Sequence, residues 1–207
     1  MFSRDGTQLL KVSCDHLVRI HGLKSGQMLK EFRGHQSYVN TTFFSSDASK
    51  VISTSSDGTL KIWSTKTTEC LQTLQPPKES YAAEVDVVSA LLMPNAFEVE
   101  ENIVVCTRTS DMHLMSMRGD VVLTCKSCPL IDREKIGNFV ACTLSMHRKW
   151  LYGVADKGFV VTFDAATGKL ETSMQICNAD AFGIAHHPHR NIIATYSGNR
   201  YVRLWKA

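Results

Sequence analysis

Long apolar runs are missing from this sequence of 207 residues. No stretch approaches the roughly 18 to 20 uncharged residues that a membrane-spanning helix needs. Dense runs of Lys and Arg are missing too, and the net charge is only +3. Proteins that bind nucleic acid through phosphate contacts concentrate basic residues into a patch. The sequence therefore predicts no membrane association, and direct RNA contact is not expected.

The usual motifs of catalysis are also missing. The chain has no Gly-rich phosphate loop, no serine nucleophile elbow and no paired-carboxylate arrangement. An enzyme on this chain would need polar residues that converge from distant parts of the sequence. We therefore expect no enzyme activity, no cofactor and no small-molecule substrate.

The sequence has seven cysteines, an odd number, and most of them lie inside apolar runs such as NIVVCTRT and FVACTLSM. This pattern indicates reduced, buried thiols in an intracellular protein. Residues 125–128, CKSC, have the spacing of half a zinc site, but no second pair follows at a suitable distance. Residues 186–189, HHPH, hold three imidazoles, yet Pro188 indicates a surface turn. We expect no metal site.

A repeat of about 40 to 45 residues runs through the chain, and this is the period of a WD-type propeller blade. Five apolar runs, LVRIH, LKIW, HLM, VVTF and VRLW, end at intervals of 42, 52, 48 and 42 residues. A turn residue stands six positions before each end, although Asp156 lies one position early in the fourth copy. The run ends are His21, Trp63, Met115, Phe163 and Trp205, and the turn residues are Asp15, Asp57, Thr109, Lys157 and Asn199.

The second copy contains four short runs rich in Val, Ile, Phe and Thr: YVNTTFF, KVISTS, TLKIW and CLQTL. Turn residues separate them, which predicts an antiparallel meander of four strands. No long amphipathic helix competes with this interpretation. We predict an all-β fold, a β-propeller of WD40 repeats, with about five blades or part-blades of a seven-bladed ring. The expected units are residues 1–33 (a partial blade without most of its first strand), 34–75 (the best-formed blade), 76–128 (divergent and expanded), 129–176 (divergent) and 177–207 (the last blade, without its fourth strand).

Two of these five units are incomplete at the chain ends. We therefore expect the chain to be the C-terminal part of a longer propeller, either a fragment or a truncated gene model. Exposed sheet edges favour aggregation, so we expect the isolated chain to be poorly soluble.

The pair Gly34-His35 and the segment SSDGTLKIW, residues 55–63, resemble a WD40 repeat whose final Asp has become Ser64. In that family a histidine, a strand hydroxyl, the turn aspartate and the tryptophan form a hydrogen-bonded tetrad inside each blade. The resemblance implies a structural tetrad of His35, Ser55, Asp57 and Trp63, with Ser53 as the competing hydroxyl.

Physical chemistry supports a structural role for this tetrad. A buried carboxylate, imidazole or indole N–H is costly unless each has a partner, and a satisfied network fixes the turn. We interpret Asp57 as scaffolding rather than as a catalytic residue. The other copies depart from the pattern, so only the second is expected to form the complete tetrad.

Longer stretches indicate a particular family. VRIHGLKSGQMLKEFRGH (residues 18–35), SSDGTLKIWSTKTTEC (55–70) and IAHHPHRNIIATYSGNRYVRLWKA (184–207) resemble the C-terminal blades of spliceosomal WD40 proteins of the SMU type, suppressor of mec and unc. The resemblance implies a nuclear scaffold in pre-mRNA splicing that acts in spliceosome activation and splice-site choice. A partner named RED is implied for the full-length family, whose N-terminal helical region is not present in these residues.

Partners of such propellers commonly dock on the face formed by the loops before the first strand and after the second. Tyr38 and Asn40 would be presented there, just beyond Gly34-His35. Exposed Tyr residues often carry interface energy, although Tyr38 could equally pack between blades. The alternatives are a WD40 scaffold of another nuclear or cytoplasmic complex, or a propeller that contacts RNA directly.

Overall fold

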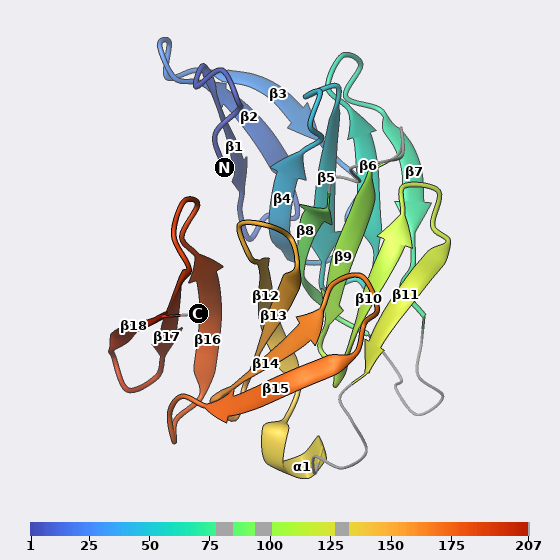
Figure 1. Cartoon of the computed structure of the whole chain (residues 1–207). Helices are drawn as coiled ribbons and strands as arrows, with labels where there is room; N and C mark the ends of the chain where they lie inside the picture. The colour runs from blue at the N-terminus through green and yellow to red at the C-terminus, as the bar shows by residue number, and fades with distance from the viewer. Residues whose placement is uncertain (78–84, 94–100, 127–132, 207) are drawn as a thin grey trace. The chain divides into compact units, whose positions relative to one another are not determined.

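The computed structural model describes residues 1–77, 85–93, 101–126 and 133–206. Within these residues the chain forms 18 strands, arranged in antiparallel sheets of three or four strands, and one short helix. Each sheet follows the chain as a meander of consecutive strands (Figure 1). The predicted all-β fold is therefore confirmed.

The first two sheets differ in size. The first has the order β1-β2-β3, and the second has the order β4-β5-β6-β7. The strands predicted for the second copy agree with those observed to within one residue. The bounds are β1 (Gln8–Val12), β2 (Val18–Gly22), β3 (Met28–Phe32), β4 (Val39–Phe44), β5 (Lys50–Ser55), β6 (Leu60–Ser64) and β7 (Cys70–Leu74).

Three further sheets follow along the chain. Two have four strands, ordered β11-β10-β9-β8 and β12-β13-β14-β15, and the last has three, ordered β16-β17-β18. A one-turn helix, α1 (Arg133–Ile136), precedes β12 and has no counterpart in the predicted repeat. The strand bounds are β8 (Val87–Met93), β9 (Asn102–Thr107), β10 (Asp111–Ser116), β11 (Val121–Lys126), β12 (Phe139–Leu144), β13 (Trp150–Ala155), β14 (Phe159–Asp164), β15 (Leu170–Gln175), β16 (Ala181–His186), β17 (Ile192–Ser197) and β18 (Val202–Lys206).

The chain divides into two compact units. Unit 1 comprises Met1–Ile103 with Ser116–Asp120, and unit 2 comprises Val104–Met115 with Val121–Ala207. The boundary between the units runs through the third sheet.

Burial within the second sheet falls from β5 to β7. Side chains of successive strand residues point to opposite faces, and β5 is buried at every position from Val51 to Ser55. Both faces of β5 are therefore covered. In β7, by contrast, Cys70, Leu71 and Thr73 are exposed. Side chains of the outer strand β7 are therefore more exposed than those of β5.

The core of unit 1 lies between its first two sheets. Phe32 at the end of β3 contacts Trp63 of β6, with ring centroids 5.9 Å apart. Apolar residues of β1, β2, β4 and β5 complete this cluster, and the burial of their apolar surface stabilises the unit. Its buried members are Leu10, Val18, Ile20, Phe32, Val39, Phe44, Val51 and Trp63.

The core of unit 2 lies between the fourth and fifth sheets. Tyr152 and Val154 of β13 pack with Ile193 of β17, and half-buried Trp205 of β18 packs against this cluster. A hydrogen bond from the His186 backbone N–H to Thr143 Oγ1, at 3.3 Å, joins β16 to β12. The two sheets are therefore held together by apolar packing and by at least one polar contact.

The first and last sheets have three strands each. Phe2 forms an isolated bridge with Leu9, and the Met1 amino group donates to the Leu10 carbonyl at 2.8 Å, so the first residues lie against β1. In the last sheet, Val202 and Leu204 of β18 are each 72% exposed.

Candidate functional site: a buried polar tetrad and the loop beside it

The polar cluster of the second sheet begins at the loop between β3 and β4. His35 in this loop is buried, and its Nδ1 donates to Asp57 Oδ2 at 2.8 Å. The same carboxylate oxygen accepts the Gln36 backbone N–H at 2.9 Å. Asp57 lies in the turn between β5 and β6, so these two bonds tie the loop to that turn.

The second carboxylate oxygen of Asp57 closes the turn itself. Asp57 Oδ1 accepts the backbone N–H of Thr59 at 2.9 Å and its hydroxyl at 2.6 Å. Gly58 between them has a φ of +79°, a conformation that favours glycine. Both oxygens of the carboxylate are therefore satisfied, which removes most of the penalty for burying it.

The hydroxyl that joins His35 to Trp63 is that of Ser53. Ser53 Oγ lies 2.8 Å from His35 Nε2 and accepts the Trp63 Nε1–H at 2.8 Å. Together these bonds form one chain from the indole through the hydroxyl and imidazole to the carboxylate, and the chain requires His35 to carry its proton on Nδ1.

Ser55, which the sequence analysis placed in the tetrad, is not part of this hydrogen-bonded network. Its hydroxyl donates to the Ser37 carbonyl at 3.2 Å and accepts the Asp57 N–H at 3.1 Å. The register explains the difference, because Val51 lies opposite Trp63. Ser53 is two residues further along β5, about 7 Å away, whereas Ser55 is about 13 Å away and out of reach of the indole.

Burial and hydrogen bonding set the charge states of the pair. Desolvation lowers the pKa of His35, and the neighbouring Asp57 only partly offsets this. Desolvation alone would raise the pKa of Asp57, but hydrogen bonds from Thr59, Gln36 and His35 outweigh it and lower that pKa. The lowered pKa of each group favours a neutral His35 imidazole beside an ionised Asp57 carboxylate.

The last sheet repeats one hydrogen bond of this network, the bond from the tryptophan indole to a strand hydroxyl. Trp205 Nε1 donates to Thr195 Oγ1 at 2.9 Å, and Ile193 lies opposite Trp205 in the same register that places Val51 opposite Trp63. The sequence interpretation missed Thr195. The available signal was a hydroxyl residue ten positions before the tryptophan, which Ser53 and Thr195 share and Ser55 does not.

A hydroxyl two residues before the turn residue contacts that residue in several copies. In the second copy the Ser55 hydroxyl accepts the Asp57 N–H. In the pairs Ser13–Asp15 and Ser197–Asn199 the hydroxyl donates to the side chain of the turn residue, and Thr107 and Thr109 are bonded at 2.9 Å. The repeat therefore preserves the turn more widely than it preserves the tryptophan.

Comparison with known proteins identifies a known repeat in this chain. The model of the WD domain, G-beta repeat, matches residues 26–64, which include β3 to β6 and the whole tetrad. The chain contains a WD repeat. Its antiparallel sheets of three and four strands are the blades of a WD40 propeller, as predicted.

Relatives of this WD-repeat protein differ in how much of it they match. WD40 repeat-containing protein smu1 of Dictyostelium discoideum is 37% identical over 179 residues, which are 86% of this chain and 32% of the relative. THO complex subunit 6 of Arabidopsis thaliana is 36% identical over 25% of the chain and 14% of its own length. Eukaryotic translation initiation factor 3 subunit I of Aspergillus oryzae is 32% identical over 34% of the chain and 21% of its own length. The chain thus spans about a third of the smu1 relative, and the expected resemblance to the SMU type is confirmed.

The structure separates the two residues expected to bind a partner. The Tyr38 side chain is 56% exposed, and its ring meets the edge of His16 at 5.6 Å. The Asn40 side-chain amide donates to the Val87 carbonyl of β8 at 2.8 Å and to Ser56 Oγ at 3.1 Å. Tyr38 is thus available at the surface, whereas Asn40 joins two neighbouring sheets of this WD-repeat protein.

The structure also shows where the HHPH segment and the first part of the CKSC segment lie. His186 ends β16 and stacks on Tyr152 at 6.0 Å, while His187 and His189 are exposed in the following turn. Cys125 is buried, and Cys128 lies outside the described residues. Among the described residues, no three His, Cys, Asp or Glu side chains are grouped so that they could hold a metal ion.

The remaining cysteines are divided between surface and core. Cys14 and Cys70 are exposed, whereas Cys106, Cys142 and Cys177 are buried as free thiols. Burial in unit 2 raises the pKa of Cys125 to about 11, which keeps that thiol protonated and unreactive. In the part of the chain that the structure describes, no helix is long and apolar enough to cross a bilayer.

Proposed function

We propose that this WD-repeat protein is part of a non-catalytic, nuclear protein-interaction scaffold in pre-mRNA splicing. In this role it supports spliceosome activation and splice-site choice. Its blades dock protein partners, and the full-length protein acts with a RED-type partner.

The similarity to smu1 is the observation that carries this proposal. It extends over 86% of the chain, and so it must include divergent copies in which the general blade pattern is weak. The other relatives named above match no more than 34% of the chain. A similarity that extends beyond the shared blade pattern supports a shared role more strongly than one confined to it.

The buried tetrad supports a non-catalytic role. Ser53, His35 and Asp57 have the connectivity of a serine hydrolase triad, because His35 contacts both other residues at 2.8 Å. However, the Ser53 side chain has 0% exposure, and its oxygen already accepts the Trp63 indole N–H. A nucleophile needs access to substrate and a free lone pair, so this network acts as a structural bracket.

Tyr38 supplies the proposed partner contact of unit 1. It is the large exposed aromatic residue of the loop between β3 and β4, and this loop is anchored at both ends by His35 and Asn40. An aromatic anchor on a rigid loop loses little conformational entropy when it binds. Asn40, which was also expected to bind, holds this loop to β8 through its hydrogen bond to the Val87 carbonyl.

A second candidate function is a scaffold in another complex of the nucleus or cytoplasm. The names of two relatives, THO complex subunit 6 and eukaryotic translation initiation factor 3 subunit I, favour this class because both denote subunits of large assemblies. Their matches are short, which is why the splicing role is preferred.

Depletion and add-back in a splicing extract test the proposal. Removal of the full-length protein from nuclear extract should block splicing of a reporter pre-mRNA after assembly has begun, and the purified protein should restore it. A depleted extract that splices at the normal rate would contradict the splicing role and leave the second candidate.

A further inference from the structure

A groove of about 420 Å³ opens between the fourth and fifth sheets, entirely within unit 2. Its walls come from β13, β14 and β15 on one side and from β17 and β18 on the other (Figure 1). This volume lies within the range of ligand-binding pockets, roughly 300 to 1,000 Å³. Most of the residues that line the groove are apolar or aromatic: Trp150, Tyr152, Val160, Met174, Ile193 and Trp205.

The strand registers show which part of unit 1 is equivalent to this groove. Each lining residue follows its counterpart in unit 1 at the same interval along the chain. The two sets also pair in the same way: Val18–Phe32 corresponds to Val160–Met174, Leu10–Ile20 to Tyr152–Thr162, and Val51–Trp63 to Ile193–Trp205. The unit 1 residues are members of its buried cluster. The groove of unit 2 therefore lies where unit 1 has a packed core.

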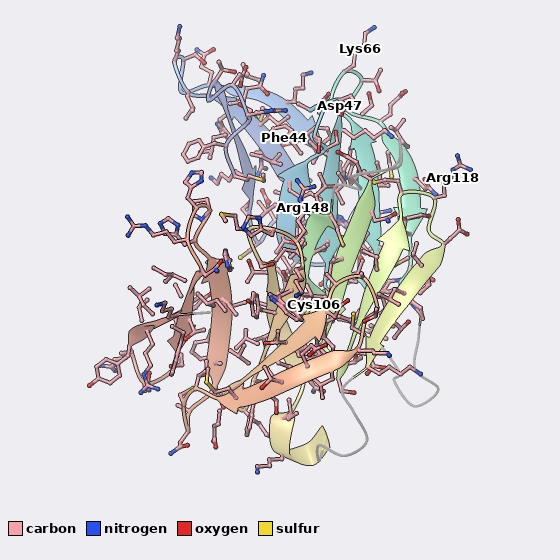
Figure 2. All side chains as sticks on the ribbon, viewed as in Figure 1. Phe44, Asp47, Lys66, Cys106, Arg118 and Arg148 are labelled. Atoms are coloured by element: carbon pink, nitrogen blue, oxygen red, sulfur yellow. The ribbon has the colours of Figure 1, made fainter. Side chains whose placement is uncertain are left out.

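Unit 1 fills this space with its own side chains. Phe32 of β3 is 1% exposed, and its ring centroid lies 5.9 Å from that of Trp63. Phe44, labelled in Figure 2, is buried in the same cluster. An aromatic ring from the outer strand of the first sheet thus covers the tryptophan of the next sheet.

Unit 2 has smaller or less buried side chains at two of these positions. Met174 stands where unit 1 has Phe32, and it is 44% exposed. Thr162 stands where unit 1 has Ile20, so a polar side chain replaces a buried apolar one. Protein interiors are close-packed, and the loss of an aromatic ring at one position and of an aliphatic side chain at the other accounts for the open groove.

Trp205 is the residue that this opening leaves uncovered. It is half-buried, whereas Trp63 is 1% exposed. Its indole N–H already donates to Thr195 Oγ1 at 2.9 Å. The part of the indole that borders the groove therefore offers apolar surface rather than a hydrogen-bond donor, and an apolar or aromatic group is the ligand that suits it.

Two charged side chains of opposite sign also line the groove. Glu171 is exposed on β15, and Lys206 is exposed on β18. Among the described residues, neither side chain has a hydrogen bond or ion pair. Both can therefore meet charges on a ligand. A protein segment with one basic and one acidic residue beside an aromatic residue complements these charges, whereas a small apolar molecule gains nothing from them.

We propose that this groove binds an aromatic side chain of a partner protein, flanked in the partner by a basic and an acidic residue. The ring takes the place that Phe32 has in unit 1 and packs against the Trp205 indole. Glu171 and Lys206 hold the flanking residues of the partner. This inference rests on the proposed scaffold function and names the kind of segment that unit 2 binds.

Fluorescence titration of the 207-residue chain with synthetic peptides tests the proposal. The probe is a peptide with the core Lys-Phe-Glu between Gly-Ser flanks, and Ala replaces Phe in the control peptide. Intrinsic fluorescence reports binding, because two of the three tryptophans, Trp150 and Trp205, line the groove. The test variant is Met174→Phe, which restores the aromatic residue of unit 1. The matched control is Met28→Phe, the same change at an exposed methionine of β3.

The wild type should bind the Phe peptide at least about tenfold more tightly than the Ala peptide, since an aromatic side chain is buried. Met174→Phe should lose about tenfold in affinity for the Phe peptide and should melt no lower than the wild type, because its own ring fills the groove. Met28→Phe should change the affinity by less than about twofold. Lys206→Glu, at an exposed position, should weaken binding by up to about fivefold, which keeps the test valid if Met174→Phe is unstable.

Equal affinity for the two peptides, or unchanged binding by both Met174→Phe and Lys206→Glu, would overturn the proposal. Benzyl alcohol that binds as tightly as the Phe peptide would assign the groove to a small molecule instead. An affinity for the peptide that falls as the chain concentration rises would assign it to a second copy of this chain. These titrations use purified components, so their failure is distinguishable from failure of the splicing assay.

Discussion

Ser53 is the residue through which the polar contacts of the second sheet are connected. It contacts both the His35 imidazole and the Trp63 indole, and its side chain is completely buried. Removing a shared partner leaves two buried groups unsatisfied, whereas removing a terminal member leaves one. The loss of unfolding free energy on replacement should therefore differ among the members of the tetrad.

Replacement of Ser53 by Ala should lower the free energy of unfolding by about 2 to 3 kcal/mol, because two buried groups lose their partner. Ser55→Ala should lower it by only about 1 kcal/mol, since the two partners of the Ser55 hydroxyl, the Ser37 carbonyl and the Asp57 N–H, belong to half-buried residues. Urea unfolding followed by Trp fluorescence measures both. Equal losses for the two variants would show that the hydroxyls are interchangeable.

The pH dependence of stability follows from His35 and Asp57. The folded-state pKa of His35 is below 6.5, so the unfolded chain binds a proton more readily. The stabilisation is complete above about pH 6.5 and decreases as the pH falls below that value. The lowered pKa of Asp57 adds a second loss below its ordinary value of 3.8. In His35→Gln, the decrease in unfolding free energy between pH 7 and pH 5 should be smaller than in wild type; an unchanged slope would assign it to other histidines.

The sequence predicted three of the four tetrad members because a Gly-His pair, a turn aspartate and a tryptophan stand at recognisable spacings. It could not decide between Ser53 and Ser55, because both lie on the same face of β5. Only the pairing of Val51 with Trp63 settles which hydroxyl the indole reaches.

At the scale of secondary-structure elements, the loop between β3 and β4 combines an anchor and an exposed residue. Asn40→Ala should lower the free energy of unfolding by about 1 kcal/mol through loss of the hydrogen bond to the Val87 carbonyl. Tyr38→Ala should leave stability within about 0.5 kcal/mol of wild type and weaken partner binding. Thermal unfolding and quantitative co-purification measure the two effects. A destabilised Tyr38→Ala protein would instead support packing between blades.

The turn between β5 and β6 depends on Gly58. A Cβ at this position would lie 2.9 Å from the Val85 carbonyl oxygen, and φ is +79°. Gly58→Ala should therefore lower the free energy of unfolding by more than about 1 kcal/mol. Gly26→Ala is the matched control, because φ is +66° there and the space is open. Urea unfolding should show a smaller loss for Gly26→Ala; equal losses would mean that only backbone strain matters.

The strands were predictable because alternation and turn residues are local features. KVISTS and CLQTL in the second copy became β5 and β7 with the expected bounds. The helix α1 was not predicted, since four residues are too few to show a helical period. The contact of Asn40 with the Val87 carbonyl was not predicted, because Val87 is 47 residues away in the sequence.

At the scale of the whole molecule, the last sheet exposes an apolar face. Phe182, Tyr196, Val202 and Leu204 are each more than 50% exposed, and exposed apolar residues in such a group favour association. The isolated chain should self-associate as its concentration rises, and Val202→Glu/Leu204→Glu should reduce this. Sedimentation velocity at several concentrations measures the effect. A sharp monomeric profile for the wild type with cooperative melting would refute it.

Under the proposed function, the chain acts through the partners that it binds. Tyr38 is the proposed contact of unit 1. The proteins that it binds should belong to one assembly, which under the proposed splicing role is the spliceosome.

The most direct test is affinity purification of the tagged full-length protein from nuclear extract, with quantitative mass spectrometry of the proteins bound to wild type and to Tyr38→Ala. We predict that spliceosomal proteins dominate the wild-type sample and that a subset is depleted by Tyr38→Ala. Enrichment of translation-initiation or mRNA-export subunits, without spliceosomal proteins, would contradict the account.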